Sequence, residues 1–230
     1  TSASMLYQGK RAWGAKLQAA GIVAAALGWM MLHQHDAVGW MAASPSSTTS
    51  AGTAGAGNRS GSGSGGPEIG YLAPGQRRSQ FGALLGKLER MQSSGESRFA
   101  ELLDTAARLI RRRSIIFIIS DLLDDAETLR AACRRLRYSG HDCVVVQVLD
   151  PDEVDFPFEG DSTFQDLETG IRKQVNTAEA RARYLERFRA HMAAHRALFT
   201  EVEFTHAVLR TDQDPAPALL PYLLRHVARR

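Results

Sequence analysis

The feature that most constrains the fold is a continuous apolar run over 114–120, Ser-Ile-Ile-Phe-Ile-Ile-Ser, which ends directly in Asp121. Such a run, β-branched and aromatic and without polar alternation, is typical of a strand that helices cover on both faces. A second run of this type, over 143–149, follows a helical segment and ends at Asp150. Two buried strands joined through a helix indicate a parallel pair in an α/β sheet.

The rest of the chain alternates between helical and extended patterns. Apolar residues recur at three- and four-residue spacings in some segments, and short runs rich in β-branched and aromatic residues lie between them. We expect helices over 10–35, 81–91, 98–112, 125–138, 177–199 and from 215 onward, strands over 36–43, 69–73 and 202–209, and a hairpin across 163–175. This order predicts an α/β fold with an open, mostly parallel sheet, strand 36–43 included, and helices on both faces. In such folds ligands bind at the carboxyl ends of the strands.

Composition narrows the classes of protein to which the chain can belong. The formal charge is +3 and the pI is near 9.1, with basic residues dispersed among acidic ones, so nucleic acid is not an expected partner. The longest apolar run, 19–32, has about 14 residues where a bilayer span needs roughly 20, and it predicts a buried helix rather than a transmembrane segment.

Cys133 and Cys143 lack the paired spacing of a zinc site. They indicate free thiols in a reducing compartment, so we expect a cytoplasmic protein.

One domain is expected over 1–230, with one interruption. The tract 44–66 consists mostly of Ser, Gly, Thr and Ala and has almost no bulky side chains. Because it offers too little apolar surface to offset the entropy of ordering it, we predict a flexible insertion.

Four oxygen-bearing side chains lie in loops that this topology can bring to one edge of the sheet: Ser2, Ser4, Ser97 and Asp121. Hard divalent cations such as Mg²⁺ bind oxygen ligands and retain several waters, so a few hydroxyls and a carboxylate suffice to hold one. Polar turns and helix caps use the same residue types, and from the residues alone this alternative stays open. His191 and His195 stand four residues apart on an Arg-rich helix, where we expect solvated side chains rather than a zinc site.

Three segments together resemble the loops of a von Willebrand factor A domain with a metal-ion-dependent adhesion site: Thr1-Ser2-Ala3-Ser4-Met5, Gly95-Glu96-Ser97 and Ile118-Ile119-Ser120-Asp121. That motif is Asp-x-Ser-x-Ser, then a Thr, then an Asp after a hydrophobic strand. Further segments, 36–39, 119–125, 140–142, 148–153 and 164–169, are similar to the bacterial family called domain of unknown function 58. The resemblance covers essentially the whole chain apart from the Ser/Gly-rich tract.

The resemblance implies a set of metal ligands. Ser2 and Ser4 would bind Mg²⁺ directly through their hydroxyls, with Mn²⁺ or Ca²⁺ as alternatives, and Asp121 would bind it directly or through water. Ser97 falls where the family has Thr. The first Asp of the motif, and the central strand that carries it, would precede Thr1. We therefore expect an N-terminally truncated domain that lacks its first central strand and binds metal more weakly.

The resemblance also implies a function. We expect a non-enzymatic, metal-dependent protein-binding domain in which an acidic side chain of the partner completes the coordination. The implied partner is a MoxR-type AAA+ ATPase, and the pair would act like a chaperone in assembling or activating other proteins. The rival hypothesis is a magnesium-dependent hydrolase of phosphate esters. No Ser/His/Asp grouping in the sequence suggests nucleophilic catalysis.

Overall fold

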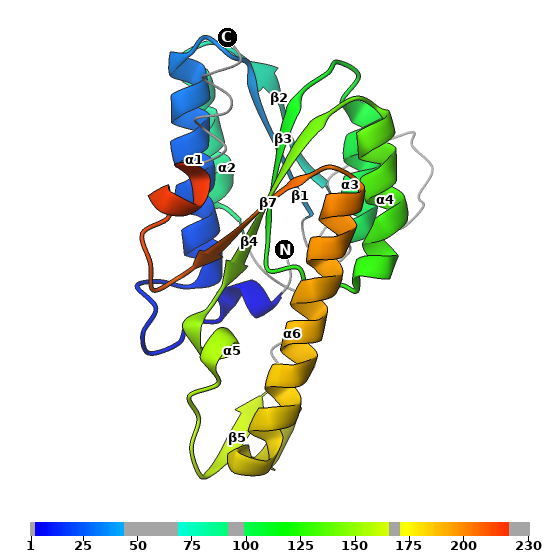
Figure 1. The fold of residues 1–230 in the computed structure, drawn as a ribbon. Coiled ribbons are helices and arrows are strands. Elements are labelled where there is room, and N and C mark those ends of the chain that lie inside the picture. Colours follow the sequence, from blue (N-terminus) through cyan, green and yellow to red (C-terminus); the bar gives the residue numbers. More distant parts are fainter. Residues whose placement is uncertain (1–2, 44–68, 92–98, 166–170, 221–230) are drawn as a thin grey trace, which may run out of the picture.

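A computed structural model of the chain describes residues 3–43, 69–91, 99–165 and 171–220. A parallel sheet in the order β3-β4-β7 forms its centre (Figure 1), with strands β3 (Ile115–Ser120), β4 (Asp142–Leu149) and β7 (Thr205–Arg210). Ile118 is aligned with Val145, which in turn is aligned with His206. The expected α/β fold with an open parallel sheet is confirmed.

Helices cover both faces of this sheet (Figure 1). On one face lie α3 (Phe99–Leu109), α4 (Ala126–Tyr138) and the end of α6 (Thr177–Glu201), and on the other lies α1 (Lys16–His33). Strand β4 divides its side chains between them, because successive residues of a strand point to opposite faces. Val145 joins the cluster beneath α4 and α6, whereas Val144 and Val146 join the cluster beneath α1. The largely apolar sequence of β4, interrupted only by the buried Gln147, therefore follows from burial on both faces.

Strand β3 differs from β4 in its burial. It lies at the end of the strand order among the described residues, and of its six residues only Ile118 is fully buried. Its side chains still contribute to both clusters, Ile116 to one and Phe117 to the other.

Two antiparallel pairs flank the central sheet. Strand β1 (Val38–Ala43) pairs with β2 (Ile69–Gly75), and helix α2 (Ser79–Glu89) follows. The expected place of 36–43 in the parallel sheet is thus wrong, since β1 pairs with β2 in a separate two-stranded sheet. The expected hairpin is confirmed, because β5 (Asp161–Gln165) pairs with β6 (Arg172–Asn176). With the first half of α6 it extends beyond the central sheet (Figure 1).

Two predicted boundaries move because backbone groups find partners elsewhere in the fold. Helix α1 begins at Lys16 instead of residue 10, since the Trp13 N–H donates to the Thr211 carbonyl oxygen and Ala15 is extended. Strand β7 begins at Thr205 because α6 continues to Glu201, after which Glu203 takes a positive φ of 56° that turns the chain. Both shifts follow from tertiary contacts that local periodicity does not encode.

Several predictions from sequence fall wholly or partly outside the described residues. The tract 44–66, the turn 166–170 of the hairpin, and residues 221–230 of the expected C-terminal helix are not described, whereas 216–220 are helical. No helix in the described ranges is long and apolar enough to cross a membrane.

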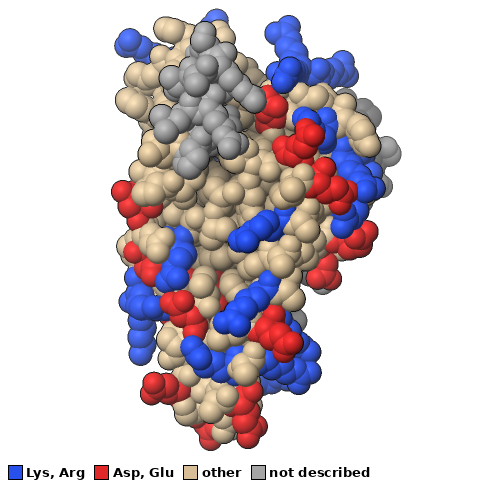
Figure 2. Space-filling view, in the orientation of Figure 1, with Lys and Arg blue, Asp and Glu red and all other residues tan. Residues whose placement is uncertain are grey.

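Charged side chains of both signs lie side by side over α4 and α6 (Figure 2). Arg134 of α4 forms an ion pair with Glu201 at the end of α6 (N–O 2.6 Å), and Arg137 pairs with Glu203. Arg135 pairs with Asp104 of α3 at 2.5 Å. These arginines are neutralised locally, so this surface does not present one sign of charge.

Candidate functional site at the carboxyl edge of the sheet

The chain's amino-terminal segment meets the carboxyl end of β3. Ser4, in the 3-10 helix η1 (Ala3–Leu6), donates its hydroxyl to Asp121 Oδ2 with an O–O distance of 2.5 Å. Asp121 directly follows Ser120 and is only 3% exposed. The structure therefore brings together two of the four predicted ligands from positions 117 residues apart. Ser2 and Ser97 lie outside the described residues, and their role stays a prediction.

A buried lysine completes this contact. Lys16 Nζ lies 3.0 Å from Asp121 Oδ2 and 2.7 Å from Glu153 Oε1, and the Lys16 side chain is 0% exposed. Burial by itself lowers the pKa of Lys16, but the charges of the two carboxylates outweigh this effect and raise the pKa above its ordinary value. The ammonium is therefore charged at neutral pH and is shared between the two carboxylates.

Sequence reasoning missed Lys16 because it placed the residue inside a helix running from residue 10. Once the start of the helix is known, its sequence does indicate that Lys16 has acidic partners. Lys16 is the first residue of α1, where the positive end of the helix dipole disfavours a cation, so a lysine there calls for acidic partners. Glu153 was missed for a different reason: it lies in a five-residue helix, α5 (Pro151–Asp155), which periodicity does not reveal.

The loop after β3 holds Asp121 in place through a strained backbone. Leu122 has a φ of 54° and is fully buried, a conformation that costs of order 1–3 kcal/mol for such a residue. Its N–H donates to Ser120 Oγ (3.1 Å), and His191 Nε2 lies 2.8 Å from its carbonyl oxygen, to which it can only donate. The loop points Asp121 toward Ser4 and leaves Leu123 53% exposed.

His191 and His195 are not solvated, and that expectation is wrong. His191 is half-buried and holds the Leu122 carbonyl, while His195 is 0% exposed with its Nδ1 3.0 Å from the His191 carbonyl. Burial lowers the pKa of His195, although the hydrogen bond with the His191 carbonyl opposes this shift. Both histidines are part of the packing between α6 and the edge of the sheet.

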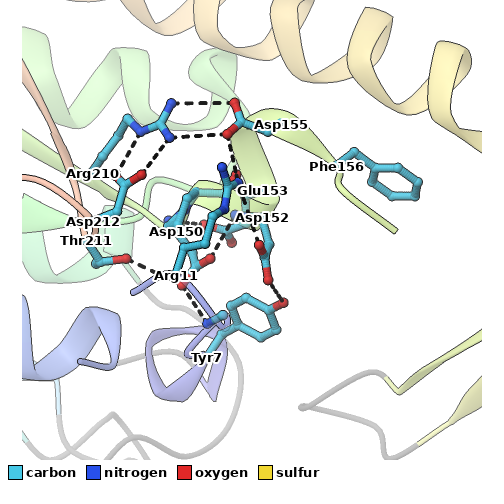
Figure 3. Close-up of polar contacts among 12 residues, drawn as sticks. Tyr7, Arg11, Asp150, Asp152, Glu153, Asp155, Phe156, Arg210, Thr211 and Asp212 are labelled. Carbon is cyan, nitrogen blue, oxygen red and sulfur yellow. Dashed lines mark hydrogen bonds and ion pairs between the residues drawn. The ribbon is translucent and has the colours of Figure 1, made fainter. Parts of the chain in front are cut away.

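Acidic residues at the end of β4 fasten the amino-terminal segment (Figure 3). Asp150 caps α5 in a reciprocal arrangement with Glu153, and its Oδ2 also accepts the Gly9 N–H at 2.8 Å. Tyr7 donates its hydroxyl to Asp152 (3.2 Å). Burial and the Asp152 charge raise the pKa of Tyr7 well above its ordinary value, so the phenol stays protonated. These contacts fix the chain just before Lys16.

Two arginines extend the same network toward β7 (Figure 3). Arg11 binds Asp155 (N–O 2.8 Å), and Arg210 binds both Asp155 (3.2 Å) and Asp212 (2.8 Å). Segments at the ends of β3, β4 and β7 are thus tied to one another by charged hydrogen bonds.

The described residues do not fit a divalent cation. Asp121 Oδ2, which accepts the Ser4 hydroxyl, also accepts from the Lys16 ammonium. Within the described ranges, no three His, Cys, Asp or Glu side chains are grouped so that they could hold a metal. A cation placed about 2.0–2.6 Å from this oxygen would stand close to a buried positive charge.

Comparison with known proteins places the chain in a family. The family described as "Protein of unknown function DUF58" matches residues 50–198. The chain belongs to the DUF58 family. The matched segment contains Asp121 and Glu153, whereas Ser4 and Lys16 lie before it.

Two curated proteins similar to the chain carry names that describe them as uncharacterized. An uncharacterized protein of Mycobacterium avium is 37% identical over 122 residues, which is 50% of this chain and 68% of that protein. An uncharacterized protein of Mycobacterium tuberculosis strain H37Rv is 34% identical over 98 residues, 43% of this chain but only 29% of that protein. The chain therefore matches less than a third of the latter relative's length.

A solved structure shows the same fold at low identity. The crystal structure of the conserved hypothetical protein BatB from Bacteroides thetaiotaomicron superposes with a TM-score of 0.52 and 12% identity. The superposition covers 100% of this chain and 95% of that one. At this identity the likeness concerns the fold alone.

Proposed function

We propose that this DUF58 chain is a non-enzymatic protein-binding domain whose partner docks over the Ser4–Asp121 contact. The observation that carries the proposal is a pair of exposed leucines, each close in sequence to one member of that contact. Leu6 and Leu123 are each 53% exposed, and each lies two residues after one member of the hydrogen-bonded pair. We call Leu6 and Leu123 the leucine pair.

Each leucine is presented by a rigidly anchored segment. In η1, Met5 is buried (4% exposed) directly before Leu6, and in the β3 loop Leu122 is buried (0%) directly before Leu123. A single exposed leucine is ordinary on a protein surface. Two exposed leucines, each directly after a buried residue and two positions after a member of the same polar contact, suit the apolar anchors of a docking site.

For the partner we propose a MoxR-type AAA+ ATPase, with the pair acting in the assembly or activation of other proteins. Membership of the DUF58 family supports this choice, together with the resemblance of three sequence segments to the loops of a von Willebrand factor A domain. A competing version keeps Mg²⁺, held by Ser2, Ser4, Ser97 and Asp121 and completed by an acidic side chain of the partner. A cytoplasmic location likewise stays a proposal.

Binding to a purified MoxR-type ATPase of the same organism, measured by biolayer interferometry, tests the proposal. Leu6→Asp and Leu123→Asp should each weaken binding at least about tenfold, corresponding to ~1.4 kcal/mol. Tyr138→Asp is the matched control, because Tyr138 is 86% exposed and ends α4 at the opposite, amino edge of the sheet.

Each outcome separates the alternatives. Undiminished binding by both leucine variants would refute the leucine pair as the docking site. Binding that EDTA abolishes, and that Asp121→Ala also abolishes, would favour the magnesium version. Turnover of phosphate esters that Asp121→Ala removes would favour the hydrolase.

A further inference from the structure

We propose that the ammonium of Lys16 is the built-in cation of the carboxyl edge, and that it excludes divalent cations from Asp121. Removal of this ammonium should convert the acidic pair of Asp121 and Glu153 into a site for a hard divalent cation. The inference goes beyond the proposed function and does not depend on the leucine pair.

The geometry around Lys16 is that of an enclosed cation. A single Nζ lies within 3.0 Å of carboxylate oxygens from two different elements, the loop after β3 and helix α5. The Lys16 side chain is 0% exposed and that of Asp121 is 4% exposed, so water does not screen their contact. The Glu153 side chain, at 23% exposed, lies at the outer rim of the pair.

The donor set is suited to a hard ion once the lysine is absent. Asp121 and Glu153 each place a carboxylate oxygen within 3.0 Å of Lys16 Nζ. Ser4 adds a hydroxyl oxygen, which is hydrogen-bonded to Asp121. Oxygen ligands of this kind are those that Mg²⁺ and Ca²⁺ prefer, and waters can fill the remaining positions. With Lys16 in place, an ion on Asp121 Oδ2 would lie at most about 5.6 Å from the ammonium, and like charges in an enclosed site repel strongly.

The position of Lys16 is enforced by its surroundings. The N–H of Lys16 donates to the Tyr7 carbonyl oxygen (3.2 Å), and the preceding segment is fixed to α5 through the Gly9–Asp150 contact. The start of α1 therefore cannot move away from Glu153 without breaking these bonds. Burial and the helix dipole both disfavour a charged ammonium at this position, so the two carboxylates are what keep the buried Lys16 charged.

Titration with Mn²⁺, followed by electron paramagnetic resonance, and with Mg²⁺, followed by calorimetry, tests the inference. The wild type and the control Lys10→Met, which removes an exposed lysine, should bind without saturation up to about 1 mM, because neither frees the carboxylates. Lys16→Met should bind at least about tenfold more tightly, and Lys16→Met/Asp121→Asn should lose this gain. Circular dichroism establishes that each variant is folded, and Lys16→Gln replaces any Lys16→Met protein that is not.

The wild type alone supplies an independent test. A ligand that binds only the folded state raises the melting temperature of a protein. Because Lys16 should keep Mg²⁺ from binding, about 10 mM Mg²⁺ should leave the melting temperature of the wild type unchanged. A magnesium-dependent rise that Asp121→Asn abolishes would overturn the inference, as would folded Lys16 variants that gain no affinity. Either result would leave docking at the leucine pair intact, and failure of the leucine variants would leave the role of Lys16 intact.

Discussion

Replacement of Lys16 by Met should be among the most destabilising single changes at the sheet edge. It leaves Asp121, whose side chain is 4% exposed, without its buried counter-charge, and removes the inner partner of Glu153. At 3.0 Å the attraction between Lys16 and Asp121 is roughly 5 kcal/mol at an effective dielectric constant of 20, and the desolvation of both ions offsets much of it. Removing one member of such a pair while the other stays buried typically costs about 3–5 kcal/mol.

A double-mutant cycle isolates the pair. The free energies of unfolding of the wild type, Lys16→Met, Asp121→Asn and the double variant would be measured by urea denaturation at pH 7. We expect the double variant to lose less than the sum of the single losses, with a coupling energy of about 2–3 kcal/mol. The control is Arg134→Met, which removes the ion pair with Glu201 from a side chain 53% exposed and should cost less than about 1 kcal/mol.

The pH dependence of the stability contributed by Lys16 provides a second check. Because the folded-state pKa of Lys16 is raised above 10.5, its contribution is fully present below pH 10.5 and is lost as the pH rises through the folded value. On the alkaline side, the difference in unfolding free energy between the wild type and Lys16→Met should therefore shrink only as the pH rises through the raised pKa of Lys16. Additive single losses, within about 0.5 kcal/mol, would refute the reasoning that Lys16 and Asp121 act as a buried pair.

Three further predictions concern other parts of the molecule. Burial, followed by the charge of His195, lowers the pKa of His206 from 6.5 to about 4. The free energy of unfolding should therefore fall by up to ~3 kcal/mol as the pH drops from 6.5 to 4, measured by urea denaturation. His206→Gln should flatten this pH dependence. Gly9→Ala should destabilise the fold by about 1–3 kcal/mol, because an added methyl group would clash with the carboxylates of Asp150 and Asp152. Gly21→Ala, in open space on α1, should instead stabilise the fold, and equal effects of the two substitutions in thermal melts would contradict this. Burial raises the pKa of the Cys133 and Cys143 thiols to about 12, so a thiol reagent at pH 8 should label them only after unfolding, and rapid labelling of native protein would show the packing to be wrong.

The sequence was sufficient to predict the layered fold. The apolar runs of β3 and β4 and the helical periodicities between them are local signals, and each reflects burial on a face that the element itself defines. The carboxyl ends of parallel strands share one edge, so Asp121 was expected there, and the resemblance to adhesion-site loops implied that Ser4 would meet it.

Only the tertiary structure decided which charges share that edge. Lys16 and Asp121 are 105 residues apart and Lys16 and Glu153 are 137 apart, so no local pattern records that one ammonium lies between the two carboxylates. The left-handed backbone of Leu122 and the separate pairing of β1 with β2 likewise depend on tertiary contacts of the folded chain. Periodicity encodes which side of an element is buried, whereas the partner of a buried charge is set by the three-dimensional packing that brings distant segments together.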